Sequence, residues 1–228
     1  AQTIFDDIDL IIYDAGSSGA EKQIIKTYCE KYPNIDYIRD EEKVGSSECF
    51  NRMIKRSPND FIGMISLDDR PTQDYAEVLR KHLFYSKVSL VYGDCWVTKT
   101  ANTHIAQVRP EHKNLHLPLY EHSREDFSRE NMIKSLPGPM PMFRKDMIES
   151  HGGFDTSLKH ANDWELWLRC VRGGSIFQKV HTIIGAYYFN PDGVTTSPEN
   201  FQSKITEEKN IFNEYIDVLG HENYNQYK

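Results

Sequence analysis

The first half of the chain alternates between two patterns of hydrophobic residues. Short apolar runs bounded by polar or turn residues are typical of buried strands, and segments with an apolar residue every three to four positions are typical of helices. The pattern predicts strands at 9–13, 35–39, 61–67 and 88–97, with helices between them at 21–32, 47–56 and 73–85. This β-α-β order predicts an α/β fold, with a doubly wound, mostly parallel sheet and flanking helices.

The second half of the chain is less regular. Residues 99–127 form a long polar segment rich in His, Asn and Pro, which is typical of a functional or disordered loop. Beyond it the pattern predicts strands at 140–144 and 176–189, helices at 145–150 and 162–172, and one or two helices over 199–219. The length of 228 residues fits one α/β domain, so we expect a domain over 1–197 and a helical extension over 198–228.

Acidic residues follow two of the predicted strands. Asp14 ends the run 9–13, and Asp68 with Asp69 ends the run 61–67. In open α/β sheets, ligands bind outside the carboxyl ends of the strands. The positions of these carboxylates therefore predict a ligand site at that edge of the sheet.

The adjacent carboxylates Asp68 and Asp69 repel each other unless a positive charge neutralises them. A divalent cation bound to a diphosphate is one solution, because Mg²⁺ and Mn²⁺ prefer oxygen ligands. The competing interpretation is a solvated turn that caps the helix after Pro71, and for the pair taken alone this is the favoured one.

Asp14 is followed by five small residues, Ala-Gly-Ser-Ser-Gly at 15–19. Its carboxylate can accept a hydrogen bond from a base or a ribose, while the small residues let a ligand approach the backbone. An N-cap of the helix that begins at Glu21 explains Asp14 equally well.

Asp163 stands at the start of the predicted helix 162–172. The free N–H groups and the dipole at this end of a helix stabilise a carboxylate, which can then serve as a general base. The alternative is a helix cap beside a core residue, Trp164, and for Asp163 taken alone the cap is favoured.

The composition narrows the classes of function. The formal net charge is −7, which argues against a nucleic-acid partner because phosphate contacts need clustered Lys and Arg. No apolar run is long enough to cross a bilayer, so we expect no transmembrane segment in this chain. We expect a cytoplasmic location, with the inner face of the membrane as a second option.

The cysteines and histidines do not form a metal-binding pattern. The four cysteines lie far apart without Cys-x-x-Cys spacing, which favours reduced thiols over a disulfide framework or a zinc site. Five histidines also lack metal-ligand spacing, and we expect them to be solvated loop residues. They are His104, His112, His116, His122 and His160.

Together these segments resemble glycosyltransferase family 2, the inverting enzymes of the GT-A fold. The matching segments are Gln2-Thr-Ile4, Asp9–Ser17, Lys43–Asn51, Phe61–Asp69, Tyr92-Gly-Asp94, Phe143-Arg-Lys145, Gly152–Asp155 and Asn162–Arg169. Each segment is a weak signal alone, whereas their order and spacing are specific.

The resemblance implies a role for each matching position. The donor-binding residues would be Asp14, Ser17, Gly45 and Asp68. Asp69 would hold a Mn²⁺ or Mg²⁺ ion on the diphosphate of a nucleotide-sugar donor, and Asp163 would be the catalytic base that deprotonates the acceptor hydroxyl. The implied reaction transfers a sugar with inversion to a glycan or lipid-linked acceptor, in bacterial polysaccharide or surface-glycan synthesis.

Several positions depart from the family pattern. Ala15, Gly19 and Ser66 each stand where many relatives carry an acidic residue, and Asn162 replaces a common Glu. The family's first strand and helix should precede Ala1, so we expect this chain to lack them. Two alternatives stay open: a catalytically inactive nucleotide-sugar-binding module, and a nucleotidyltransferase, which would normally show a Gly-rich basic phosphate loop.

Overall fold

The computed structural model describes residues 1–102, 119–122, 124–194 and 196–226. The first half contains the predicted strands and helices in the predicted order. The elements of this half are η1 (Phe5–Asp7), β1 (Leu10–Ala15), α1 (Glu21–Lys31), β2 (Ile35–Asp40), α2 (Ser46–Arg56), β3 (Phe61–Gly63), β4 (Arg70–Pro71), α3 (Tyr75–Tyr85) and β5 (Leu90–Thr98). The short elements η1 and β4 were not predicted.

The second half also follows the predicted order, with short 3₁₀ helices added and with one strand, β6, inside the segment 99–127 that was predicted to be a loop. Its elements are β6 (Leu119–His122), η4 (Glu130–Lys134), β7 (Met142–Arg144), α4 (Lys145–His151), α5 (Asn162–Arg172), β8 (Phe177–Tyr188), η5 (Pro198–Asn200), α6 (Phe201–Glu214), α7 (Ile216–Leu219) and η6 (His221–Gln226). Residues 103–118 of the predicted long loop, with His104, His112 and His116, lie outside the described residues.

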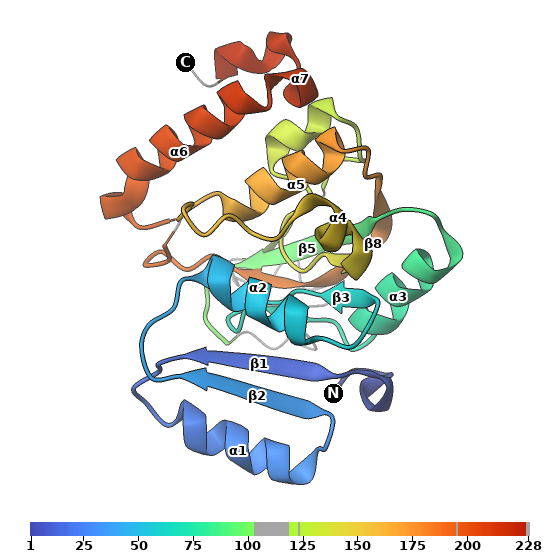
Figure 1. Cartoon of the computed structure of the whole chain (residues 1–228), viewed down its shortest axis with the longest axis vertical. Helices are drawn as coiled ribbons and strands as arrows, with labels where there is room; N and C mark the ends of the chain where they lie inside the picture. Colours follow the sequence, from blue (N-terminus) through green and yellow to red (C-terminus); the bar gives the residue numbers. More distant parts are fainter. Residues whose placement is uncertain (103–118, 123, 195, 227–228) are drawn as a thin grey trace.

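The strands of the described residues form two sheets (Figure 1). In the smaller sheet β1 pairs with β2 in parallel, from Leu10 opposite Ile35 to Ala15 opposite Asp40. The larger sheet has the order β3-β7-β5-β8-β4, and β6 pairs with the second half of β5. Because β7 runs antiparallel to both β3 and β5 while β5 and β8 are parallel, the larger sheet is mixed.

β5 is the central strand of the larger sheet, and all of its nine residues are buried. Its sequence explains this, because it carries apolar side chains toward both faces, as strands covered on both sides do. Its register with β8 shifts at Gly93 and Asp94. A side chain at position 93 would place its Cβ 2.6 Å from Cγ2 of Ile184, so the close approach of the two strands requires glycine there.

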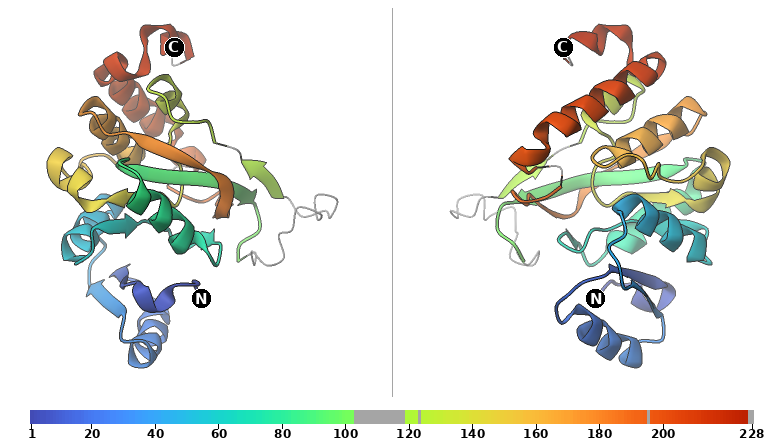
Figure 2. Two further views of the ribbon diagram at one scale, coloured as in Figure 1. Left: turned by 90° about the vertical axis from the view of Figure 1, so that its right-hand side faces the viewer. Right: turned by 60° about the vertical axis from the view of Figure 1, so that its left-hand side comes forward.

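Helices cover both faces of the larger sheet (Figure 2). On one face Leu79 and Leu83 of α3 pack with Val91 of β5. On the other face Trp167 of α5 packs with the neighbouring residue Leu90, as the alternation of side chains along a strand dictates. The central strand β5 is therefore packed on both of its faces.

The C-terminal helices belong to this same core. Phe212, Tyr215 and Leu219 are buried in the cluster that contains Trp167. The prediction that His160 is solvated is wrong: it is only 7% exposed, and its Nε2 lies 2.9 Å from Oγ of Ser203, because α6 covers this part of the loop. None of the helices that the structure describes is long and apolar enough to cross a membrane.

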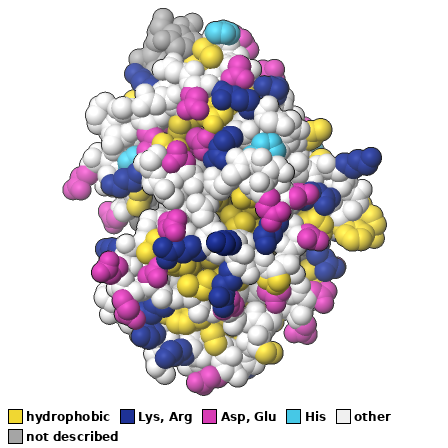
Figure 3. Space-filling view, in the orientation of Figure 1, with side chains coloured by type: hydrophobic (Ala, Val, Ile, Leu, Met, Phe, Trp, Pro, Cys, Tyr) yellow, Lys and Arg dark blue, Asp and Glu magenta, His cyan; other side chains and the backbone are white. Residues whose placement is uncertain are grey.

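An apolar cleft of about 1330 Å³ separates β1 of the small sheet from β3 of the larger one. Side chains from η1, β1, α2, β3 and α3 line it, including Leu10, Phe50 and Phe61. In Figure 1 the arrows of β1, β2 and β3 point the same way across it, and Figure 3 shows hydrophobic side chains exposed between the two parts of the molecule. Among the described residues, no strand pairs with the edge of β1 or with the edge of β3 that borders the cleft.

β3 is shorter than the predicted strand 61–67. Within the described part of the chain it pairs only with the three-residue strand β7, from Phe61 opposite Arg144 to Gly63 opposite Met142. The chain then leaves the sheet, so that Leu67 is 81% exposed, and it turns where the amide of Asp69 donates to the carbonyl of Ser66 at 3.1 Å. The early end of the strand lets the following carboxylates reach the edge of the sheet.

Candidate functional site

Asp14 is the fifth residue of β1, and its buried carboxylate organises the loop that follows. Its Oδ1 accepts the amide hydrogen of Ser17 at 2.8 Å, and its Oδ2 accepts the Tyr37 hydroxyl at 2.6 Å and pairs with Arg39. Burial alone would raise the pKa of Asp14, but the hydrogen bonds from Tyr37, Ser17 and Arg39 outweigh it and hold the pKa well below its usual range. The carboxylate is therefore a fixed negative charge.

The loop 14–17 is shaped by this carboxylate and by one glycine. Gly16 has φ +75°, a left-handed conformation, and a Cβ there would lie 3.1 Å from the backbone carbon of Glu42. The carbonyl of Ser17 also accepts a hydrogen bond from Nη2 of Arg39, at 3.0 Å. Among the described residues no side chain caps α1, which follows Ala20, so Asp14 is not its N-cap.

Asp69 lies at the carboxyl ends of the two central strands. Its Oδ1 accepts the amide hydrogen of Tyr188 at 3.1 Å, and Tyr188 ends β8 opposite Thr98, which ends β5. Asp69 is buried whereas its neighbour Asp68 is exposed. The turn that carries both residues thus meets the edge where ligands bind to such sheets.

The environment of Asp69 disfavours its charged form. Burial, followed by the charge of Asp68, raises the pKa of Asp69 to about 7, against the opposing effects of the Tyr188 amide and of Arg70. A cation bound beside Asp69 would stabilise the charged form of its carboxylate. Within the described residues no group of three or more His, Cys, Asp or Glu is placed to hold a metal ion.

Asp163 is the second residue of α5. Its Oδ1 accepts the amide hydrogen of Trp164 at 2.8 Å, and its own amide donates to Oδ1 of Asn162 at 2.9 Å. Burial raises the pKa of Asp163, while the amide hydrogen bonds and the charge of Arg124 act in the opposite direction. A carboxylate with a raised pKa at a helix N-terminus suits proton transfer.

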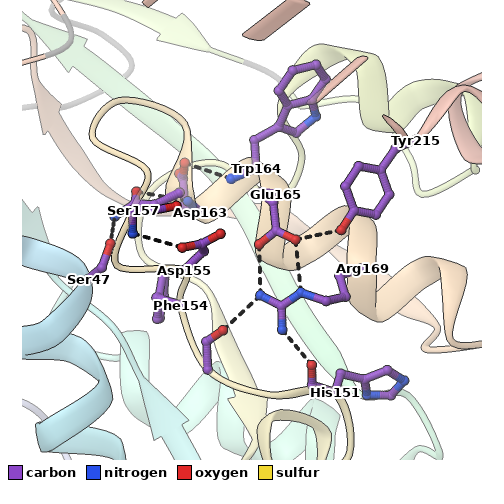
Figure 4. A network of polar contacts seen from close by, with 12 residues as sticks. Ser47, His151, Phe154, Asp155, Ser157, Asp163, Trp164, Glu165, Arg169 and Tyr215 are labelled. Carbon is purple, nitrogen blue, oxygen red and sulfur yellow. Dashed lines mark hydrogen bonds and ion pairs between the residues drawn. The ribbon is translucent and has the colours of Figure 1, made fainter. Parts of the chain in front are cut away.

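The structure brings the start of α5 to the start of α2. Nδ2 of Asn162 donates to Oγ of the buried Ser47 at 2.5 Å. Gly45 precedes α2 as its N-cap residue, in an extended conformation with open space where a side chain would be. Gly45 and Asp163, two of the predicted site residues, therefore lie on segments joined by a hydrogen bond; Figure 4 shows Ser47 close to Asp163.

Other residues of the recognised motifs support these segments. Asn51 of α2 makes two hydrogen bonds to the backbone of Phe154, to its amide at 2.8 Å and to its carbonyl at 2.9 Å. A Cβ at Gly153 would lie 2.3 Å from Oδ1 of Asn51, so this contact requires glycine. The motif around 152–155 is thereby tied to α2 and holds the loop before Asp163.

Arg124 was not predicted from the sequence, and its charge acts on both Asp163 and Tyr187, the neighbour of Tyr188. Burial raises the pKa of Tyr187, and the charges of Asp69 and Asp68 raise it further, whereas Arg124 lowers it. Arg124 also lowers the pKa of Asp163. Nε of Arg124 is buried with no hydrogen-bond partner in the described part of the chain. The only sequence signal near it is the Tyr-Gly-Asp motif, because the amide of Arg124 donates to Oδ1 of Asp94 at 2.6 Å.

Comparison with known proteins places the chain among glycosyltransferases. The model of glycosyl transferase family 2 matches residues 1–152. A relative from Haloferax volcanii, glycosyltransferase AglE, is 23% identical over 185 residues, which are 81% of this chain and 58% of the relative. An uncharacterized glycosyltransferase of Methanocaldococcus jannaschii is 19% identical over 209 residues, which are 91% of this chain and 67% of that protein.

Solved structures with the same fold include TarS and a mannosyltransferase. Staphylococcus aureus TarS in complex with UDP-GlcNAc has a TM-score of 0.68 at 13% identity, over 92% of this chain and 61% of that one. The mannosyltransferase PcManGT from Pyrobaculum calidifontis, in complex with GDP-Man and Mn²⁺, has a TM-score of 0.59 at 14% identity, over 94% of this chain and 63% of that one. The chain thus spans about three fifths of these proteins. The family match and the shared architecture show that the chain belongs to glycosyl transferase family 2 and has the GT-A fold.

Proposed function

We propose that this chain is the donor-binding and catalytic part of a glycosyltransferase that moves a sugar, with inversion, from a nucleotide-sugar donor to a hydroxyl of a glycan or lipid-linked acceptor. The observation that carries the proposal is the position of Asp69. It is a buried carboxylate at the carboxyl ends of β5 and β8, one oxygen is held by the Tyr188 amide at 3.1 Å, and the exposed Asp68 stands beside it.

The residues at this point fit a Mn²⁺ or Mg²⁺ ion. Both ions prefer oxygen ligands, and Mg²⁺ in particular is often bound by one or two carboxylates together with substrate phosphates. In our proposal Asp69 holds the ion and Asp68 contacts the ribose or diphosphate region of the donor. When bound, the ion would neutralise the negative charge of the departing nucleoside diphosphate.

The nucleotide half of the donor would lie along the loop after β1 and the start of α2. Asp14 presents a fixed negative charge to the base or ribose, and it holds the amide of Ser17 in place at 2.8 Å. Gly45 leaves the approach to the first turn of α2 open, because no side chain stands there. Arg124, whose charge lowers the pKa of Asp163, would supply positive charge to the diphosphate of the donor.

Asp163 would act as the catalytic base. It takes the proton of the acceptor hydroxyl while that oxygen forms a bond to the anomeric carbon of the donor sugar. The bond from the anomeric carbon to the β-phosphate oxygen breaks on the opposite face, so the configuration inverts. Burial raises the pKa of Asp163, and a more basic carboxylate is a better acceptor for this proton.

The related structures suggest which donors to test. TarS was solved with UDP-GlcNAc and PcManGT with GDP-Man and Mn²⁺. A role in bacterial polysaccharide or surface-glycan synthesis is part of the proposal, and it follows from the family resemblance alone.

Calorimetry and a turnover assay test the proposal together. We expect UDP or GDP to bind in Mn²⁺ or Mg²⁺ and not in chelator, and the matching nucleotide sugar to be hydrolysed or transferred. Metal-dependent binding without any turnover would instead identify an inactive nucleotide-sugar-binding module. Release of pyrophosphate from a nucleoside triphosphate would identify a nucleotidyltransferase. Failure of every nucleotide to bind in either metal would contradict the proposal.

A further inference from the structure

The loop before α5 carries three successive backbone N–H groups that converge on one carboxylate, that of Glu207 in α6. The amides of His160 and Ala161 donate to its Oε1 at 2.7 and 2.6 Å, and the amide of Lys159 donates to its Oε2 at 2.9 Å. Successive amides of this kind form an anion-binding concavity. In this protein the anion is a side chain that comes from 46 residues further along the chain.

Glu207 also supplies a hydrogen-bond acceptor and a negative charge at the N-terminal end of α5, as a capping side chain does in many helices. The first N–H groups of a helix need acceptors, and a negative charge is stabilised there by the helix dipole. Ala161 is the N-cap residue of α5, and within the described residues no side chain makes the usual cap hydrogen bond to this helix. The carboxylate of Glu207 therefore fixes the N-terminus of α5 from another helix.

A second side chain of α6 contacts the same loop. Oγ of Ser203 lies 2.9 Å from Nε2 of the buried His160. Ser203 and Glu207 are four residues apart and so lie on the same face of α6. The contact between α6 and the loop is thus a two-point attachment.

The segment after α6 attaches to α5 at a further point. The hydroxyl of Tyr215 donates to Oε1 of Glu165 at 2.5 Å, and Glu165 also forms an ion pair with Arg169 at 2.8 Å (Figure 4). The two attachment points on α5, residues 161 and 165, are one helical turn apart. Asp163 lies between them and points about 200° away, at 100° per residue. The C-terminal helices therefore hold α5 on the side away from Asp163.

We propose that Glu207 is a positioning residue for Asp163. By holding the amides of 159–161, it fixes the first turn of α5 so that Asp163 stays aimed at the acceptor hydroxyl. The inference rests on the proposed function, since it takes Asp163 to be the catalytic base. It makes the C-terminal helix a part of the catalytic apparatus, although no residue of α6 touches the reacting atoms in this scheme.

The test compares Glu207→Gln and Glu207→Ala with the unchanged protein. We expect nucleoside diphosphate affinity to change less than twofold, because Glu207 is not a donor-binding residue. We expect kcat for sugar transfer to fall about 10- to 100-fold in Glu207→Ala, since a misplacement of about 1 Å costs an enzyme about that much. Glu207→Gln keeps one acceptor oxygen and should lose less.

Glu208→Gln is the matched control. Glu208 is the next residue of α6 and pairs with Lys204 of the same helix at 3.8 Å rather than with the loop before α5. If Glu208→Gln lowers kcat as much as Glu207→Gln, the effect is a general loosening of α6 and the inference is wrong. The fraction of active sites is counted by nucleotide binding, so that a loss of folded protein does not imitate a loss of kcat.

A double-mutant cycle with Asp163→Asn separates positioning from plain stability. If Glu207 acts through Asp163, Glu207→Ala should cost kcat almost nothing once Asp163 is already Asn. If the two losses multiply, Glu207 acts independently of Asp163 and the inference is overturned. If Asp163→Asn alone transfers sugar at the unchanged rate, the proposed function fails first. A normal rate in Glu207→Ala alone contradicts only the positioning role.

Discussion

Nδ2 of Asn162 donates to Oγ of Ser47 at 2.5 Å, and this hydrogen bond joins the first turn of α5 to the first turn of α2. α5 carries Asp163, the proposed base, and α2 follows Gly45, a proposed donor-binding residue. The contact between these helices therefore sets the position of the proposed acceptor site relative to the proposed donor site.

Ser47→Ala tests this relationship. Loss of the hydroxyl leaves the Asn162 amide without this acceptor, and we expect about 1 kcal/mol less stability, which lowers Tm by about 2–4 °C in a domain of this size. Transfer should fall more than nucleotide binding, because the donor loop stays folded. Ser46→Ala is the control, since its exposed hydroxyl is 3.5 Å from the same amide. Equal effects of the two changes would contradict the assignment.

The metal assignment predicts that nucleotide affinity depends on Asp69. We expect Asp69→Ala and added chelator to weaken nucleoside diphosphate binding each by more than the 10- to 100-fold that loss of a supporting group typically costs a metal site. Calorimetry in Mn²⁺ measures the affinity. Asp74→Ala, at an exposed aspartate before α3, should bind as the unchanged protein does. Unchanged affinity in chelator and in Asp69→Ala would show that the ion, if any, binds elsewhere.

Asp14 predicts a pH dependence of stability. Its pKa is depressed in the folded protein, so its contribution to stability is present above the ordinary value of 3.8 and is lost as the pH falls toward the depressed folded value. We expect Asp14→Asn to be less stable than the unchanged protein at pH 7, and the difference to shrink below about pH 4. Thermal melts from pH 3 to pH 8 measure this.

The matched control for Asp14 is on the neighbouring strand. Asp36→Asn removes an ion pair with Arg56 in which both side chains are more than a third exposed, and such pairs contribute little. It should melt within a degree or two of the unchanged protein at every pH, by the same scaling. If Asp14→Asn behaves in the same way, the hydrogen bonds to Asp14 do not stabilise the fold.

The cleft between β1 and β3 predicts a further strand. β1 has an open edge toward the cleft, β3 has another, and apolar side chains line the space between them. We propose that an extended segment of the same polypeptide, apolar on both faces, pairs with both edges and joins the two sheets, because a sheet interrupted inside leaves backbone groups unpaired. Hydrogen exchange of the Leu10–Ala15 amides measures its presence.

For the 228 residues alone, we expect fast exchange in β1 and a broad melt. A protein that carries the additional strand should protect these amides and melt cooperatively. The proposal is wrong if the 228-residue polypeptide, verified by intact mass, melts cooperatively and transfers sugar.

The helices and strands could be predicted because the hydrophobic pattern that identifies each of them lies within its own residues. All nine residues of β5 are buried, and the apolar run at 88–97 indicates such a strand without knowledge of its neighbours. The end of β3 could not be predicted, because it depends on the three residues with which β7 can pair. The apolar run continues to Leu67, so the pattern alone extends the strand too far.

Residues of the proposed site could likewise be predicted where the indication is local in the sequence, and not where it depends on distant partners. Asp14, Asp68 and Asp69 were predicted because a strand end is visible in the sequence, and the alternation of elements places strand ends at one edge. Arg124 and Glu207 were missed because their significance comes from distant partners, Asp94 and the amides of 159–161. A glutamate in an exposed amphipathic helix carries no local sign that its carboxylate completes another helix.

The assignment of Asp163 as the base gives the most direct prediction. The residue is at the second position of α5, its Oδ1 is held by the Trp164 amide at 2.8 Å, and burial raises its pKa. Asp163→Asn keeps the size of the side chain and the carbonyl oxygen that accepts this hydrogen bond. Fold and nucleotide affinity should therefore change little, whereas transfer should fall by about 10²–10⁴-fold, the usual contribution of a general base.

Asp155→Asn separates the two kinds of carboxylate in this region. Asp155 accepts the amide hydrogen of Ser157 at 2.8 Å, and hydrogen bonds from Ser157 lower its pKa, so it is ionised and structural. We expect that change to lower Tm more than it lowers kcat. If Asp163→Asn transfers sugar at the unchanged rate, another group is the base. If it unfolds or loses nucleotide binding, Asp163 stabilises α5, and the helix-cap interpretation of this residue is the correct one.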